Sequence, residues 1–524
     1  MASPARRRTG ARVGVLALAT AVLLAGPTAL AFFSGGYFEE PRVWAGLGAW
    51  LLVAIGLVAG GELPRGRIAW LAIGSIALLA GWTLLSRTWA PIAGSAYQAA
   101  QIVVLYTGVL LAAAILLRHR AARRAVEPAL AAGALIVVGY GISERLLPGI
   151  LHFARSLSAE GRLEQPLTYW NAMGELAAIG FVLCARLAGD LSRAGAMRAL
   201  AVASTAPLGL GLYLSISRGA LFACAAGLIA LVVAAPRREQ LQAVVLCVSA
   251  GTAAALVAAT MSGLSTISGS LSSRETQGAI MLVVLVALGG GAALALRMLE
   301  RRKPSAELRL PRGAPLIAAA LIGAGLALAI VIGAKESSKE PVVTAGVSRY
   351  ATLQSDRYAY WSVALHDFES QPLHGVGAGG WAVDWLRYRK ISTFAQDAHS
   401  LPLQTLAELG LVGLALLIGF VAGIALAMRA VWRASAPLAA GAIAGFVVWL
   451  AHAPLDWDWQ MPAVTVPALV LAGLILAAAG DRTPDGAAQA SAKVAANEPG
   501  AQRRGAPAAS SPGARHTIAR DISR

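Results

Sequence analysis

Fourteen long apolar runs constrain this chain more strongly than any other feature of its sequence. Each run has on the order of 20 residues, the length that an α-helix needs to cross about 30 Å of hydrocarbon. Only 14% of the 524 residues are charged, too few to cover the surface of a soluble enzyme. We therefore predict an all-α polytopic membrane protein with about 14 transmembrane helices, within a range of 12 to 14. The runs lie near residues 12–33, 43–60, 67–86, 97–117, 125–144, 170–188, 198–216, 219–235, 240–260, 278–296, 314–334, 402–428, 434–453 and 461–480.

Basic residues are distributed unequally between the two sets of short loops. The loops on the side of the N-terminus contain twenty-three Lys and Arg residues, and those on the other side contain seven. Because positively charged loops stay in the cytoplasm, we expect both termini to be cytoplasmic. The first run follows three arginines and is expected to remain as a signal anchor. The net charge of +17 then reflects membrane topology, and nucleic acid is not an expected partner.

The runs divide the chain into four parts. Residues 1–334 would form transmembrane helices 1 to 11, and residues 402–480 would form helices 12 to 14. Between them, residues 335–401 would form one large extracytoplasmic helical loop. Residues 481–524 are rich in Ala, Pro, Gly, Ser and Arg without periodicity, which predicts a disordered basic cytoplasmic tail. No spaced metal-ligand pattern or disulfide framework is present, because the three cysteines lie in apolar runs.

The long loop contains aromatic and histidine residues that a tether would not need. Its aromatic residues, such as Trp361, are either anchors at the lipid interface or a platform for a sugar or lipid. Residues 350–368 have helical periodicity, and Arg357 falls on the apolar stripe. An arginine in that position is costly unless it meets a carboxylate or an anionic ligand. Both alternatives stay open at this point.

A glycine-rich segment follows this predicted helix and contains His374, Gly375 and Gly377. Its glycines permit positive φ or the close approach of a ligand. The spacing is not that of a phosphate-binding loop, because no strand precedes it.

The loop ends with Asp397, His399 and Ser400. Ser400 is placed to cap a long apolar helix, which carries Glu408 on its second turn. Asp397, His399 and Glu408 would therefore converge near one helix start. A histidine at this boundary is either structural or a general base.

A second polar signal lies at the hairpin tip of residues 215–219, which is so short that Arg218 lies almost at membrane depth. Such a charge must face the protein interior or a polar cavity. Taken singly, the polar residues predicted on the same side are interfacial anchors or helix-packing contacts. Together they indicate an outward-facing cavity lined by charged, histidine and aromatic side chains. These residues are Arg162, Glu164, Tyr169, Trp170, Asn171, Glu175, His452, Asp456, Asp458 and Trp459.

The order of these motifs resembles the O-antigen ligase and polymerase superfamily over at least residues 165–430. The resemblance rests on Ser217-Arg218-Gly219, Ser355-Asp356-Arg357-Tyr358-Ala359-Tyr360-Trp361, Pro372-Leu373-His374-Gly375-Val376-Gly377 and Ala398-His399-Ser400-Leu401-Pro402-Leu403-Gln404. It implies a helical, GT-C-like glycosyltransferase of the bacterial cytoplasmic membrane. Such an enzyme moves a glycan from an undecaprenyl diphosphate carrier to a glycan, lipid or protein acceptor on the outer face, with no cofactor and no required metal.

The resemblance also implies residue roles. His399 matches the histidine proposed as the base for the acceptor, and Arg218 and Arg357 match arginines thought to bind the diphosphate. This fits the chemistry, because a departing diphosphate develops negative charge that guanidinium groups stabilise. Further substrate contacts are expected from Asn171, Tyr169, Trp361, His374, Gly375, Gly377, Asp397, Glu408, His452 and Asp456.

Two departures from the family pattern are visible. Ser400 follows the histidine where the family commonly has Asn, and two more runs are present than the usual twelve. These departures leave the choice among ligase, polymerase and protein-glycosylating enzyme open, together with the acceptor and the oligomeric state.

The main alternative is a membrane transporter of a small solute, such as inorganic carbon, or of a lipid-linked sugar. Transporters of this size often contain broken helices in two repeated halves, and the sequence shows no such repeat. A non-enzymatic scaffold protein is the third interpretation.

Overall fold

The computed structural model describes residues 4–301, 308–311, 313–337, 355–434 and 439–480. Over these ranges every regular element is a helix. Twelve helices are long and apolar enough to cross a membrane, and two shorter apolar helices, α8 (Arg218–Ala234) and α16 (Ala440–His452), match the remaining predicted runs. The predicted fold class is confirmed, and the protein is a polytopic membrane protein. The predicted disordered tail lies outside the described residues.

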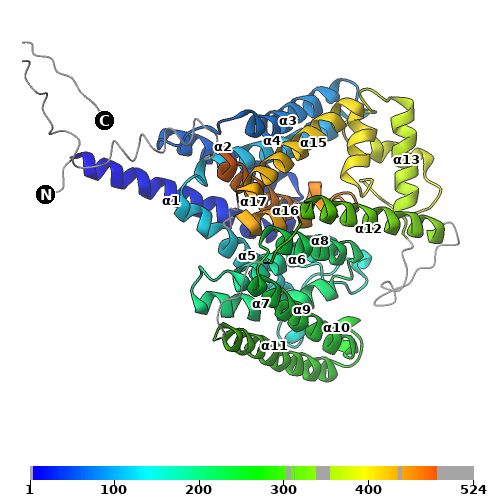
Figure 1. Ribbon diagram of the computed structural model, residues 1–524. Helices are drawn as coiled ribbons and strands as arrows, with labels where there is room; N and C mark the ends of the chain where they lie inside the picture. Colours follow the sequence, from blue (N-terminus) through cyan, green and yellow to red (C-terminus); the bar gives the residue numbers. More distant parts are fainter. Residues whose placement is uncertain (1–3, 302–307, 312, 338–354, 435–438, 481–524) are drawn as a thin grey trace, which may run out of the picture. The chain divides into compact units, whose positions relative to one another are not determined.

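The helices of the first half pack both on sequence neighbours and on helices further along the chain (Figure 1). Helix α2 contacts α4, and α3 contacts both α4 and the later helix α15. The apolar sequence favours helices because lipid offers no partner for a free backbone group. The bounds are α1 Pro4–Ala31, α2 Glu39–Val58, α3 Arg67–Leu85, α4 Ala93–Leu116, α5 Arg120–Leu146, α6 Trp170–Gly189 and α7 Gly195–Leu214, with 3₁₀ turns η1 Ser34–Gly36, η2 Ser86–Thr88 and η3 Leu157–Ala159.

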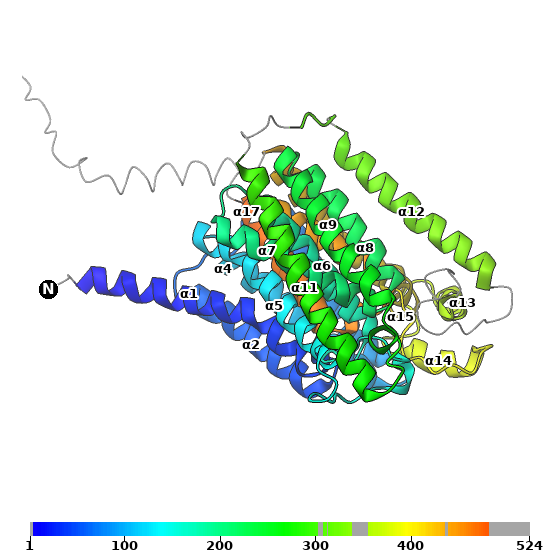
Figure 2. The ribbon, with the colours of Figure 1, turned by 90° about the horizontal axis from the view of Figure 1, so that it is seen from below.

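Helix α6 is the most enclosed of the spanning helices. It contacts α5, α7, α8, α9 and α16, and every residue of its apolar window is buried. Most of its residues are apolar or small on every side, which is typical of a helix surrounded by others, but it also buries Asn171, Glu175 and Arg186. Figure 2 shows α7 and α9 running beside it. The bounds of the following helices are α9 Arg238–Ala259, α10 Ser262–Ser265, α11 Leu271–Glu300 and α12 Ala314–Ser337.

The predicted large loop contains two helices in its described part, α13 (Arg357–Ser370) and α14 (Gly380–Tyr388). Helix α13 packs against α14 and α15. We predicted a helix over 350–368, but residues 355 and 356 precede α13 and residues 350–354 lie outside the described part. A small second core joins the loop to the start of α15, through Tyr360, Trp361, Val363, Ala364, Trp381, Trp385, Ala395, Ala398 and Ala407.

Helix α15 (Leu401–Arg433) is broken at Gly410, although the sequence predicts one continuous run. Gly410 has φ 64° and ψ −162°, a conformation that glycine adopts without steric cost. The glycine-rich segment after α13 crosses this break, and the amide of Leu411 donates to the carbonyl of Pro372 at 2.9 Å. The break therefore has a tertiary cause. The remaining elements are η6 Asp458–Gln460 and α17 Pro462–Gly480.

Candidate functional site

An ion pair joins the loop helix α13 to the segment between α16 and α17. A terminal nitrogen of Arg357 lies 2.6 Å from Oδ2 of Asp456, whose side chain is fully buried. Burial disfavours the charged form of both groups, but the opposite charge of the partner outweighs this effect. The pKa of Arg357 is therefore raised, and the pKa of Asp456 is lowered. Of the two alternatives for Arg357, the structure shows the pairing with a carboxylate, and the guanidinium is still partly exposed.

The other oxygen of Asp456 continues this network into α6. Oδ1 accepts a hydrogen bond from the hydroxyl of Tyr169 at 2.6 Å and another from the backbone amide of Trp457 at 2.9 Å. The side-chain amide of Asn171 donates to the same hydroxyl at 2.7 Å. Asp456 is thus enclosed and accepts three hydrogen bonds, so it orients Arg357 and Tyr169 and is poorly placed to act as a base.

His399 lies between two aromatic rings next to this network. Its ring centroid is 5.1 Å from that of Tyr360 and 6.1 Å from that of Trp457, the residue after Asp456. Its Nδ1 is 2.9 Å from the backbone carbonyl of Asp397. A carbonyl only accepts, so Nδ1 carries the proton, and Nε2 of the neutral ring has a lone pair available.

Two properties of His399 suit a proton acceptor. Burial, aided by the positive charge of Arg357, lowers its pKa against the opposing effect of Asp456, so the ring is neutral near pH 7. Its φ of 52° is a left-handed conformation that is uncommon for a residue other than glycine. Such strain is often found at functional sites, where the surrounding structure holds it in place.

Two further carboxyl groups, those of Asp397 before α15 and Glu408 within it, are linked by Gln404. Gln404 donates from its side chain to Asp397 at 2.9 Å and lies 3.5 Å from Glu408. Burial raises the pKa of Asp397. Gln404, Glu408 and Trp457 line a cavity of about 50 Å³. The predicted convergence of Asp397, His399 and Glu408 is therefore present in the structure.

Ser400 occupies the N-cap position of α15, but its side chain makes no capping hydrogen bond. The prediction that the Ser400 side chain caps α15 is therefore wrong. The helix start is held instead by Leu401, whose amide donates to the carbonyl of Ala453 at 2.9 Å.

The glycine-rich segment has a packing role in the structure. The amide of Val376 donates to the backbone carbonyl of Ala407 at 2.9 Å, and the amide of Gly377 donates to the backbone carbonyl of Glu408 at 2.8 Å. Side chains at Gly375 or Gly377 would overlap neighbouring backbone. His374 is a neighbour of Trp89, with ring centroids 5.3 Å apart. The contacts of these three residues are thus with α15, the α3–α4 turn and one another, not with Arg357 or His399.

Three other predicted site residues, Trp361, Arg218 and His452, lie in surroundings other than the hydrogen-bond network of Arg357 and Asp456. Trp361 is buried in the second core, so a role in stacking on a sugar would require it to move. Arg218 is the first residue of α8, and the adjacent Gly219 lies against the ring of His452. His452 is fully buried and pairs with Asp458, not with the Arg357 network.

Sequence reasoning missed two aromatic residues at the site. The ring of Trp457 lies 4.5 Å from that of Tyr169 and 5.4 Å from that of Tyr37. The Tyr37 hydroxyl donates to Gln396 at 2.8 Å. The only sequence signal was the alternation of Asp and Trp over residues 456–459, which does not show which tryptophan faces the site.

Comparison with protein families places part of the chain. Residues 275–418 match a family model described as O-antigen ligase. This region is shorter than residues 165–430, over which the motifs resemble the family, but it contains Arg357, His399 and Glu408. Tyr169 and Asp456 lie outside it. No curated protein matches the chain.

Proposed function

We propose, from the premise that residues 275–418 form an O-antigen ligase domain, that this protein is a membrane glycosyltransferase of cell-surface polysaccharide biosynthesis. It moves a glycan from an undecaprenyl diphosphate carrier to an acceptor hydroxyl or amide. The family match implies lipid-linked glycan transfer in general. The carrier, the bacterial cytoplasmic membrane and an outward-facing site come from the motif resemblance and the distribution of basic residues.

One observation carries this proposal: a neutral histidine and an arginine held by a buried aspartate meet at one site. His399 packs on Trp457, and Trp457 adjoins Asp456, which holds Arg357. A base for an acceptor proton and a cation for a departing diphosphate are the two groups that glycan transfer from such a carrier needs.

In the proposed step, the acceptor oxygen attacks the anomeric carbon of the donor glycan. Its proton passes to Nε2 of His399, while Nδ1 remains bonded to the carbonyl of Asp397. The bond between the anomeric carbon and the phosphate oxygen breaks, and the diphosphate leaves with the electron pair. Arg357 and Arg218 stabilise the charge that develops on its oxygens, and we propose that no metal ion is needed for this step.

Other residues position these groups. Asp456 and Tyr169, fixed by Asn171, hold the guanidinium of Arg357 in place. Glu408 and Gln404 line the cavity beside Trp457, where a polar substrate group would find hydrogen-bonding partners.

The test uses purified protein in nanodiscs with an undecaprenyl diphosphate oligosaccharide and a crude envelope fraction as acceptor. Release of undecaprenyl diphosphate is followed with and without EDTA. We expect EDTA-resistant release that falls by at least about 100-fold in His399→Ala and in Arg357→Ala.

Matched controls come from the same loop. His366 and Arg387 are exposed, and His366→Ala and Arg387→Ala should retain release within about twofold of the parent. If the parent releases no carrier where a control family member is active, the transferase proposal fails. Counterflow in liposomes would then test the transporter alternative.

A further inference from the structure

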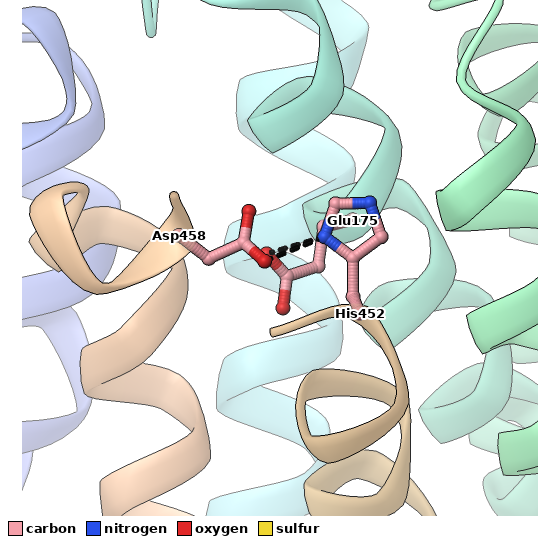
Figure 3. A group of neighbouring side chains, drawn as sticks. All are labelled: Glu175, His452 and Asp458. Carbon is pink, nitrogen blue, oxygen red and sulfur yellow. Dashed lines mark hydrogen bonds and ion pairs between the residues drawn. The ribbon is translucent and has the colours of Figure 1, made fainter. Parts of the chain in front are cut away.

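Three ionisable side chains form a closed cluster next to the candidate site. Glu175 comes from α6, His452 ends α16, and Asp458 begins η6. Nδ1 of His452 lies 2.6 Å from Oδ2 of Asp458 and 3.6 Å from Oε2 of Glu175. All three side chains are fully buried, and Figure 3 shows them pointing toward one another from three separate elements.

Several polar atoms of this cluster are unsatisfied. Within the described part of the chain, neither oxygen of Glu175 accepts a hydrogen bond, and Oδ1 of Asp458 also has no partner. A buried carboxylate oxygen without a partner is costly, because the desolvation of the charge is not compensated. The cluster therefore requires a ligand or protons that satisfy these atoms.

The charge of the cluster limits which ligands could satisfy these atoms. With both carboxylates ionised and the imidazole neutral, the cluster carries two negative charges inside the helix bundle. Two protons or one divalent cation would neutralise it. Arg357, a cation next to the cluster, already pairs with Asp456.

The donor atoms suit a first-row divalent metal ion. One ligand atom from each residue can be chosen so that all three lie within 4.8 Å of one another. An imidazole nitrogen and two carboxylate oxygens are common Zn²⁺ ligands, with bonds of about 2.0–2.2 Å. The hydrogen bond between His452 and Asp458 would open slightly as the ion replaces its proton.

We propose that Glu175, His452 and Asp458 bind one divalent transition-metal ion, with Zn²⁺ as the best fit. The ion ties α6, α16 and η6 together and so fixes the segment that carries Asp456. It is structural, because its ligands are enclosed and its place is separate from the Arg357 network. The proposal does not rest on glycan transfer, since its readout is bound metal.

The test is elemental analysis of the full chain, purified through a tag without histidine. Cells are grown with added zinc, and the protein is measured as purified and after an incubation with chelator far longer than the transfer assay, because an enclosed ion exchanges slowly. Zn²⁺ or Mn²⁺ is then added back. We expect about one Zn²⁺ per chain, reduced at least about tenfold in Glu175→Gln and Asp458→Asn. Asp384→Asn, which removes another buried carboxylate outside the cluster, should leave the metal content unchanged.

A second measurement on the parent guards against variants that do not fold. Zn²⁺ should raise its unfolding temperature in a concentration-dependent manner, and Co²⁺ loading should give visible d–d absorption. If the parent holds less than about 0.1 ion per chain after saturation, and Zn²⁺ leaves its unfolding unchanged, the proposal is overturned. The cluster would then be neutralised by two protons.

Discussion

The guanidinium of Arg357 and the carboxylate of Asp456 meet at 2.6 Å although they are 99 positions apart in the chain. One belongs to the loop helix α13 and the other to the segment before α17. Because the carboxylate is fully buried and also binds Tyr169, the pair fixes the loop at a defined place on the helix bundle.

The first prediction concerns the energy of this pair. Arg357→Gln leaves the fully buried carboxylate of Asp456 without its cation and should reduce the free energy of unfolding by roughly 3–5 kcal/mol. Asp456→Asn leaves a guanidinium that still reaches solvent, so the loss should be smaller, about 1–3 kcal/mol. The double variant should lose less than the sum, with a coupling energy of at least about 1.5 kcal/mol. The free energy of unfolding of the parent, the two single variants and the double variant is measured in detergent at a fixed lipid content.

The control cycle uses Arg387 and Asp384, whose nitrogen and oxygen are 3.2 Å apart. Because Arg387 is exposed, its coupling with Asp384 should be below about 1 kcal/mol. Strict additivity for Arg357 and Asp456 would show that their contact contributes nothing to stability.

The second prediction concerns the pH dependence of transfer. Burial lowers the pKa of His399, so the ring stays neutral, and able to accept a proton, below the usual value of about 6.5. The rate at saturating donor should therefore begin to fall only at a pH below that value. Initial rates between about pH 5 and 9 check this. An acid limb centred above about 7 would contradict His399 as the neutral base.

The third prediction concerns Asp367 on α13. Burial, together with the nearby Asp384, raises the pKa of Asp367 to about 8. The folded state thus holds a proton that the unfolded chain loses near pH 4, so stability should fall as the pH rises from about 4 to 8. Asp367→Asn should flatten this dependence and raise the unfolding temperature at pH 8. Equal slopes for parent and variant would rule out the effect.

The fourth prediction separates packing from ligand binding in the glycine-rich segment. Gly377 has φ 91°, and a methyl group there would overlap Ala90. We expect Gly377→Ala to destabilise the protein by about 1–3 kcal/mol. Gly74→Ala on α3 has open space and should change stability by less than about 1 kcal/mol. A Gly377→Ala protein with normal stability but a weakened donor affinity would favour the ligand role that the sequence suggested.

The helices were predictable because each spanning run is predominantly apolar, which is a local property of the sequence. The break at Gly410 was not, because its cause is the glycine-rich segment that crosses α15. The absent cap at Ser400 has a similar origin: the helix start is held by Ala453, far along the chain.

The site was partly predictable from its residue types. An arginine on the apolar stripe of α13 had to meet either a carboxylate or an anion, and the structure pairs Arg357 with Asp456. Residue order alone contains no distance that would select Asp456 among the available acids. It also could not separate His452 from the site, since that ring turns toward Glu175 and Asp458. The catalytic roles themselves stay predictions.

The division of the site between two parts of the chain has a consequence for chimeric proteins. Residues 275–418 contain Arg357 and His399, whereas Asp456 and Tyr169 lie outside that region. A transplant of the matched region alone would bring a guanidinium and a histidine into a host without the residues that orient them. Exchange between relatives should therefore succeed only when the segment between α16 and α17 and the start of α6 travel with the loop.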